Sequence, residues 1–320
     1  MQGLVINGSN NTFEIECDDG ITRMCTIKGK KLKTSKSYYN PLCPGDRVQI
    51  LEDELTEKSG QIIDLIPRKN EFVRWNVKRR TPQLLASNLD YLLCVTTPDE
   101  PPFRPRFIDR ALAQAEYEGI EPVIICNKWD VEAAKDPDIE YYLTIWENLG
   151  YKVLRISAKT TEGMSELARF LEGKFCALVG QSGVGKSSII NRIDSNCVLK
   201  TGSLSEKYGR GTHTTTKGTL IHLKLNEAML GGRKGAIADI VDTPGVRRFL
   251  LHEIEPCDLA LYFREFKPLL GQCTYGMSCT HKQEPGCKIL EAVYAGVITD
   301  ERYDSWKRIK EEIETGSWAD

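Results

Sequence analysis

The sequence has no long hydrophobic run. Within its 320 residues, whose mean hydropathy is -0.35, no apolar segment approaches the ~18 residues that a membrane-spanning helix needs. The first ten residues also lack the cationic start and apolar stretch of a secretory signal. We therefore expect no membrane span and a cytoplasmic protein.

The sequence also has little net charge and no disulfide framework. Its 43 basic and 45 acidic residues give a net charge of -2, so the chain as a whole carries no nucleic-acid signal. The 11 cysteines are scattered and odd in number, which leaves at least one thiol unpaired and argues against a secreted disulfide scaffold. Any contact with a polyanion must come from local patches.

What the chain does have is enough length for two or three domains of about 150 residues each. Its first 67 residues contain five short strand-like segments separated by turns rich in Gly, Asn, Asp and Pro, which predicts a small β-barrel of the OB type. The five segments are 2–7, 12–17, 21–27, 47–52 and 61–66.

Apolar strands alternate with amphipathic helices from about residue 84. Met164, Leu167, Ala168 and Leu171, for example, have the spacing of one helix face. Such alternation predicts an α/β domain with a mostly parallel sheet and helices on both faces. The strand candidates are 89–95, 122–126, 152–156, 175–179, 219–225 and 236–241.

Positive charge is concentrated in two stretches near the N-terminus. Residues 23–36 hold six basic residues and no acidic one, and residues 68–80 hold six more against Glu71 alone. Tyr38, Tyr39 and Trp75 are interleaved with them, which favours RNA contact over two merely solvated loops. The candidate RNA-binding residues are Lys28, Lys30, Lys31, Lys33, Lys36, Arg74, Lys78, Arg79 and Arg80.

A phosphate-binding motif follows the strand candidate 175–179. Gly180–Ser187 fits G-x-x-x-x-G-K-[ST], and a helix-like segment comes directly after it, as in a P-loop. Backbone N–H groups would hold the phosphates, Lys186 would reach the β and γ oxygens and assist catalysis, and Ser187 would ligate Mg²⁺. The residues expected at the nucleotide are Gly180, Gln181, Ser182, Gly183, Val184, Gly185, Lys186, Ser187 and Ser188.

Two further motifs select guanine over adenine. Asn127, Lys128, Trp129 and Asp130 fit N-K-x-D, and the Asp130 carboxylate can accept from guanine N1–H and the 2-amino group, which adenine lacks. Ser157, Ala158 and Lys159 follow the next strand, where a backbone N–H would meet guanine O6. We therefore expect GTP and GDP as the ligands. Because Asn127 and Asp130 select guanine, an ATP-dependent kinase is disfavoured.

The remaining motifs sense the γ-phosphate. Asp242–Gly245 fits D-x-x-G, with Asp242 reaching Mg²⁺ through water and the Gly245 N–H meeting the γ-phosphate. The polar loop 209–216 stands where the first switch loop should be. Thr215 or its neighbour Thr214 is expected to complete the Mg²⁺ shell, with Thr215 as our assignment.

The order of these motifs is unusual. In an ordinary GTPase the P-loop, the switch threonine and D-x-x-G precede N-K-x-D and S-A-K, whereas here the last two come first. We infer that the domain is circularly permuted. The helix 162–171 then joins the base-binding half to the P-loop strand, and the segment after Gly245 runs into the C-terminal region.

The C-terminal region contains a cluster of metal-ligand residues. Cys273, Cys279, His281 and Cys287 place three thiols and an imidazole within 15 residues, which predicts one closed, structural Zn²⁺ site rather than inert thiols and a chance histidine. A charged helical pattern follows over 300–314, and it is expected either to pack back on the protein or to meet a partner.

These motifs, taken in this order over essentially the whole chain, resemble the circularly permuted, ribosome small subunit-dependent GTPases of the RsgA/YjeQ family. The resemblance implies a GTP hydrolase that assists late maturation of the small ribosomal subunit, contacts its rRNA and is stimulated by it. Val246 stands where many GTPases carry a water-orienting glutamine. The resemblance points instead to His213 as the catalytic residue, against a structural or RNA-contacting histidine.

The prediction is thus a monomer with an OB-type barrel, a permuted GTPase domain and a small, mainly helical zinc domain. We expect the barrel at 1–67, a basic linker at 68–83, the GTPase domain at 84–250 and the zinc domain at 251–320. Two alternatives stay open. One is an RNA-binding assembly factor in which nucleotide is a passive switch, and the other is a metal-delivery GTPase.

Overall fold

The computed structural model describes residues 1–9, 11–29, 32, 38–53, 56–76, 79–197, 199, 218–245 and 249–317. Several residues named above lie outside this described part of the chain: Lys30, Lys31, Lys33, Lys36, Lys78, His213, Thr214, Thr215 and Val246.

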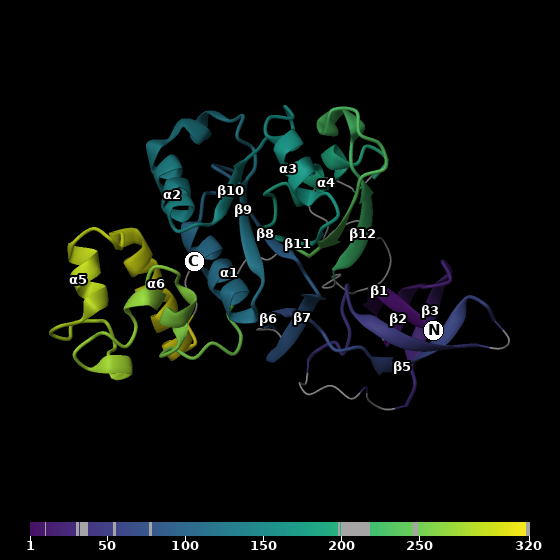
Figure 1. Ribbon diagram of the computed structural model, residues 1–320, viewed down its shortest axis with the longest axis horizontal. Helices are drawn as coiled ribbons and strands as arrows, with labels where there is room; N and C mark the ends of the chain where they lie inside the picture. The colour runs from purple at the N-terminus through teal and green to yellow at the C-terminus, as the bar shows by residue number, and fades with distance from the viewer. Residues whose placement is uncertain are drawn as a thin grey trace.

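The N-terminal strands form the predicted barrel (Figure 1). They close in the order β1-β2-β3-β5-β4, with β3 and β5 parallel and the other pairs antiparallel. Buried and exposed residues alternate along β2, β3 and β4, which directs one face of each strand to an interior of Val5, Ile15, Ile50 and Ile62. The strands are β1 (Gln2–Ser9), β2 (Thr12–Cys17), β3 (Thr22–Ile27), β4 (Arg47–Glu52) and β5 (Ser59–Leu65).

A β-hairpin, which the sequence analysis did not predict, occupies most of the expected basic linker. Strands β6 (Glu71–Asn76) and β7 (Thr81–Ser87) pair antiparallel. The apolar side chains of Phe72, Val73 and Leu84 are buried. The connection between barrel and sheet is therefore folded.

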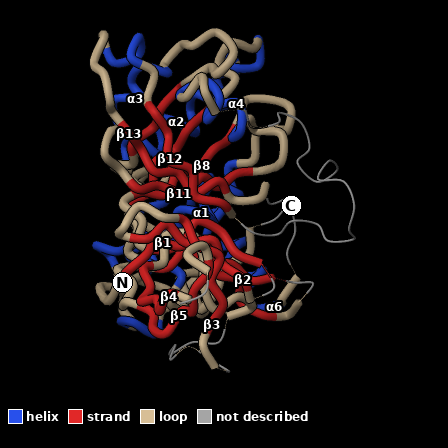
Figure 2. Tube along the Cα trace, turned by 90° about the vertical axis from the view of Figure 1, so that its right-hand side faces the viewer, coloured by secondary structure: helices blue, strands red, loops and turns tan. Residues whose placement is uncertain are grey.

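The larger domain is built on a six-stranded sheet with the order β10-β9-β8-β11-β13-β12. All neighbours are parallel except β12 and β13, which confirms the mostly parallel sheet. The strands are β8 (Tyr91–Thr96), β9 (Glu121–Cys126), β10 (Lys152–Arg155), β11 (Phe175–Gly180), β12 (Thr219–Lys224) and β13 (Ile237–Asp242). Figure 2 shows these strands above those of the barrel.

Helices cover both faces of this sheet. Leu92 belongs to a core shared with α1 and α2, whereas the next residue, Leu93, belongs to a second core shared with α3 and α4. Adjacent residues of a strand point to opposite faces, so the two helix pairs lie on opposite sides. The helices are α1 (Pro105–Glu118), α2 (Pro137–Asn148), α3 (Met164–Leu171) and α4 (Lys186–Ile193). None of the described helices is both long and apolar enough to span a membrane.

The C-terminal region packs on α1 (Figure 1). Its two helices are α5 (Lys288–Tyr294) and α6 (Asp300–Thr315), joined to the sheet by short 3-10 turns at Leu259–Tyr262, Lys267–Leu269 and Gly276–Ser278. Trp306 and Ile309 of α6 are buried in the same core as α1. Arg110 of α1 binds Glu312 of α6 at 2.5 Å, with both side chains buried. The charged helix therefore packs back on the protein.

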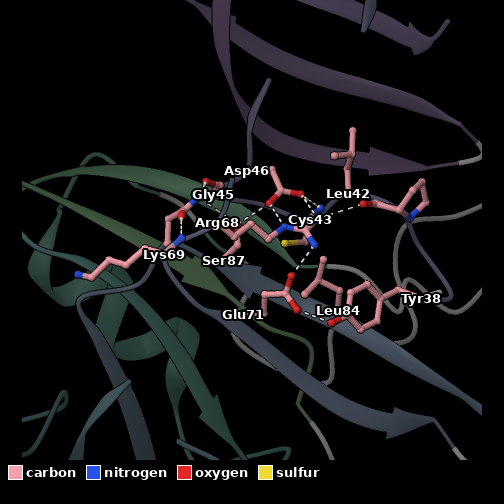
Figure 3. A network of polar contacts seen from close by, with 12 residues as sticks. Tyr38, Leu42, Cys43, Gly45, Asp46, Arg68, Lys69, Glu71, Leu84 and Ser87 are labelled. Atoms are coloured by element: carbon pink, nitrogen blue, oxygen red, sulfur yellow. Dashed lines mark hydrogen bonds and ion pairs between the residues drawn. The ribbon is translucent and has the colours of Figure 1, made fainter. Parts of the chain in front are cut away.

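A buried polar network joins the barrel to the hairpin (Figure 3). Asp46 is fully buried and accepts from Arg68 Nε and Ser87 Oγ, each at 2.6 Å. A second Arg68 nitrogen donates to Glu71 at 2.9 Å, and Glu71 also accepts from the Tyr38 hydroxyl. The buried charge is thus paired and hydrogen-bonded, as a buried carboxylate requires.

Candidate functional site

The carboxyl ends of five neighbouring strands meet at one edge of the sheet. Four of these strands lead into a nucleotide motif, and the fifth, β8, lies between them. The P-loop follows β11, residues 127–130 follow β9, residues 157–159 follow β10 and Asp242 ends β13. These strands are parallel and lie within the order β10-β9-β8-β11-β13, so their carboxyl ends share one edge. In open α/β sheets this is the edge where ligands bind.

Two positions of the P-loop require glycine for steric reasons. Gly183 and Gly185 have φ values of +90° and +94°, which favour glycine. A Cβ on Gly185 would lie 2.3 Å from Asn127 Nδ2. The loop ends where α4 begins at Lys186, so the first N–H groups of this helix are available to an anion.

Lys186 is held over the P-loop by two backbone carbonyls. Its Nζ donates to Gly180 O at 3.0 Å and to Gln181 O at 3.3 Å, and the residue is 8% exposed. Burial lowers the pKa of Lys186 to about 8, and Asp242 opposes that shift. A phosphate anion at this point would favour the charged amine.

Asp242 has an unused acceptor. Burial raises the pKa of its carboxyl, which Lys186 counteracts, and its Oδ1 is buried without a hydrogen-bond partner among the described residues. The next side chain, Thr243, donates to Leu178 O and fixes the strand end. A buried carboxylate oxygen with spare capacity fits a hydrated Mg²⁺, for which Ser187 would be the hydroxyl ligand.

Gly245 lies against the P-loop. A Cβ there would be 3.1 Å from Ser182 Cα and 3.3 Å from Lys186 Nζ. The structure therefore brings the D-x-x-G motif next to the loop that would hold the phosphates, which is the placement a γ-phosphate contact needs.

Asn127 joins the P-loop to the loop at residues 157–159. Its side chain is 2% exposed, and Nδ2 donates to Val184 O at 2.9 Å while Oδ1 accepts from the Ala158 N–H at 3.1 Å. One amide thus fixes two loops that lie far apart in the sequence. Lys128, in the left-handed region at φ 62°, donates to Glu100 O beside them.

Asp130 is prepared as an ionised acceptor. Ser157 Oγ donates to its Oδ1 at 2.6 Å, and Lys159 Nζ lies 3.7 Å from Oδ2. The Ser157 hydrogen bond, together with Lys159, lowers the pKa of the Asp130 carboxyl. A carboxylate in this place matches the two guanine donors.

The chain after the D-x-x-G motif is clamped between the hairpin and α1. Phe249 is fully buried with its ring 5.5 Å from that of Phe72, and the Trp75 N–H donates to Leu250 O at 3.2 Å. The His252 N–H donates to Gln114 Oε1 at 2.8 Å. No sequence motif marks these residues, and only their apolar character could have suggested burial.

The four predicted zinc ligands form one buried cluster. Their ligand atoms all lie within 4.8 Å of one another. Cys273 Sγ is 3.9 Å from Cys287 Sγ and 3.7 Å from His281 Nδ1, which is 3.4 Å from Cys287 Sγ. A tetrahedron with Zn–S bonds of about 2.3 Å separates its ligands by roughly 3.5–3.8 Å, so the cluster fits Zn²⁺. With four protein ligands it leaves no open position for metal transfer.

The described basic residues differ in their surroundings. Lys28, Arg79 and Arg80 are exposed, and the Arg79 guanidinium lies 4.7 Å from the Tyr39 ring centre. Arg74 is partly buried and donates to Gln83 Oε1 at 3.0 Å, and burial lowers its pKa. Arg74 is thus engaged within the hairpin.

The chain is similar to known proteins over its whole length. The family model described as RsgA GTPase matches residues 65–252. A relative from Flavobacterium johnsoniae named small ribosomal subunit biogenesis GTPase RsgA is 36% identical, covering 97% of this chain and 93% of the relative. A relative of the same name from Borreliella burgdorferi strain ZS7 is 36% identical, covering 97% of this chain and 95% of the relative.

Solved structures agree with the observed architecture. The crystal structure of YjeQ from Thermotoga maritima has a TM-score of 0.72 and 30% identity, with 98% of each chain covered. The structure titled YloQ, a circularly permuted GTPase, has a TM-score of 0.69, covering 100% of this chain and 96% of that chain. At 22% identity, this second likeness supports the fold alone.

Proposed function

The chain belongs to the RsgA GTPase family, and we propose from this membership that it is a GTP hydrolase that binds the small ribosomal subunit and assists its late maturation. The names of its full-length relatives support the partner. The observation that carries the GTPase chemistry is the meeting of four nucleotide motifs at one sheet edge. There, Asn127 is hydrogen-bonded both to the P-loop and to the loop at residues 157–159, which we call the base loop.

We assign the site residues as follows. The P-loop N–H groups and Lys186 bind the phosphates, Asn127 to Asp130 and Ser157 to Lys159 bind guanine, and Gly245 meets the γ-phosphate. Ser187, Asp242 through water and Thr215 hold Mg²⁺, which supplies charge neutralisation at the phosphates. His213 orients the attacking water when the protein is bound to the small subunit, because Val246 has no side chain able to do so.

The other parts of the chain serve attachment to RNA. We propose three domains, at 1–67, 84–250 and 251–320, in a monomeric protein, and the hairpin fills most of the segment 68–83 and extends into the start of the second domain. The barrel, the basic residues and the zinc domain contact rRNA, and one Zn²⁺ per chain, held by Cys273, Cys279, His281 and Cys287, stabilises the last domain. The closed ligand set disfavours metal delivery.

The decisive experiment measures GTP turnover of the full chain alone, with purified small subunits and with purified large subunits. We expect turnover to rise at least tenfold with small subunits only, because a loop ordered by its partner limits catalysis in the free protein. Equal turnover in all three reactions would contradict the proposal and favour a factor in which nucleotide is a passive switch.

A further inference from the structure

Arg192, near the end of α4, is bound to the backbone of the base loop. Its Nε donates to Ala158 O at 2.7 Å and one terminal nitrogen donates to Lys159 O at 3.1 Å. No carboxylate of the described residues forms an ion pair with it. The planar guanidinium thus uses two fixed donors on two consecutive carbonyls, which a single point charge cannot do.

These two bonds set the direction of the loop's N–H groups. In a trans peptide the C=O and the following N–H point in opposite directions. With Ala158 O and Lys159 O turned toward Arg192, the N–H groups of Lys159 and Thr160 point away from α4. The Thr160 N–H does donate to Ser157 Oγ at 3.0 Å, on the hydroxyl that also binds Asp130.

On the side of α4, Ala158 is buried in the apolar core that this helix shares, and the loop also borders a cavity. This cavity, of about 430 Å³, is bordered by Ala158, Lys159 and three residues of α4, Ser188, Asn191 and Arg192. Asn127 holds the loop from the P-loop side through the Ala158 N–H. Arg192 provides a polar anchor from the side of α4, at the edge of this cavity.

We propose that Arg192 is a positioning residue for guanine recognition, which holds the Ala158–Lys159 peptide so that a backbone N–H of this loop is aimed at guanine O6. Arg192 itself does not touch the nucleotide. The inference rests on the proposed function, since it assumes that this loop reads the base.

The test compares two ligands by equilibrium titration: GDP and 2-aminopurine riboside 5′-diphosphate, which has hydrogen in place of O6. The analogue also lacks N1–H, so the ratio of their dissociation constants reports the contacts to O6 and to Asp130 together. Arg192 does not touch Asp130, so a change of this ratio on substitution of Arg192 reports the O6 contact. In Arg192→Met we expect this ratio to fall by about tenfold, mainly through weaker GDP binding, and in Arg192→Lys to recover in part. Arg192→Gln, which keeps one donor, serves if the methionine variant does not fold.

The control is Arg233→Met, which removes an exposed arginine that pairs with Glu172 at 2.9 Å, away from the nucleotide motifs. It should keep the wild-type ratio. An unchanged ratio in Arg192→Met, or an equal loss for both ligands, would overturn the inference. If the wild-type protein itself fails to prefer GDP over the analogue, the assignment of the base loop fails instead.

Discussion

Asp130 shows how a single residue can specify the ligand of a whole domain. Ser157 and Lys159 keep its carboxyl ionised, so both oxygens are acceptors toward any base that enters. Adenine has no N1–H and no 2-amino group, and against adenine the carboxylate would receive no hydrogen bond from the base. The cost of these missing hydrogen bonds is what makes the selection strong.

Asp130→Asn should therefore weaken GTP binding by about 2–4 kcal/mol and admit xanthosine triphosphate, whose C2 carbonyl accepts from an amide. Competition binding with both nucleotides measures this change. Asp138→Asn, an exposed carboxylate in the first turn of α2, is the control and should bind GTP normally. A variant at Asp130 that still prefers GTP over the xanthine nucleotide would show that this residue does not read the base.

Substitutions at His213 and Lys186 should distinguish two roles: positioning the attacking water and binding the nucleotide. His213→Ala should leave GTP affinity almost unchanged and remove most of the stimulation by small subunits, a loss of about 100-fold in turnover. Lys186→Ala should impair nucleotide binding itself, because its amine faces the phosphates in the ground state too. Single-turnover assays with and without subunits measure both. Full stimulated turnover in a His213→Ala protein that still docks would assign the water to another group.

At the scale of elements, Zn²⁺ bound at the Cys/His cluster would hold in place a segment with few apolar residues. His281 lies beside Trp306 of α6, with ring centres 6.1 Å apart, and its carbonyl accepts from the Tyr303 hydroxyl at 2.8 Å. The loops that carry the ligands are thus fastened to the helix that packs on α1. Loss of the metal should loosen both.

Protein purified without added zinc should contain about one Zn²⁺ per chain, and Cys279→Ser should lose it together with part of the C-terminal fold. Elemental analysis and limited proteolysis measure the two effects. Cys257→Ser removes an exposed thiol outside the cluster and should change neither. A metal-free preparation whose C-terminal region resists protease as well as the wild type would refute the zinc assignment.

At the scale of the whole molecule, the hairpin contacts the chain that follows each of the two segments that we propose sense the γ-phosphate. A Cβ on Gly218, directly after the first switch loop, would lie 3.5 Å from Leu85 O of β7, and Leu250 accepts from Trp75 of β6. The same hairpin is bound to the barrel through Arg68 and Asp46. One small element therefore touches the nucleotide-sensing chain and the proposed RNA-binding barrel.

A histidine also bridges barrel and sheet directly. His222 on β12 places Nε2 at 2.8 Å from Glu16 of β2 and Nδ1 at 2.6 Å from Asp239 of β13. The Asp239 hydrogen bond, helped by Glu16, raises the pKa of His222 above its ordinary value of 6.5. The protonated imidazole therefore stabilises this contact below about pH 6.5, and the stabilisation disappears as the pH rises through the raised pKa.

The measurable consequence is a pH-dependent difference between the wild type and His222→Gln. Urea unfolding from pH 6 to pH 9 should show the wild type more stable at the acidic end, with the difference shrinking as the pH rises. Glutamine gains no proton in this pH range, so the variant lacks the stabilisation that a protonated imidazole provides. A difference that stays constant over the range would mean that the bridge does not depend on protonation.

The sequence by itself determined the chemistry of this protein, because that chemistry depends on short motifs. Gly180–Ser187, Asn127–Asp130 and Asp242–Gly245 are local patterns, and their reversed order fixes the permutation without any knowledge of contacts. The barrel and the sheet were predictable for a similar reason, since alternation with period two and helix spacing are read within one segment. The four Cys and His residues were likewise visible within 15 residues, and their ligand atoms do meet.

Only the tertiary structure decided what depends on distant partners. The basic segment 68–83 reads as a linker because its charges outnumber its apolar residues, yet Phe72 and Val73 are buried in cores supplied by other parts of the chain. Similarly, α6 packs against α1 because Trp306 is buried in a core that distant parts of the chain supply. Arg192 carries no motif at all, and its role arises because folding places two carbonyls, 33 and 34 residues away in sequence, within reach of one guanidinium.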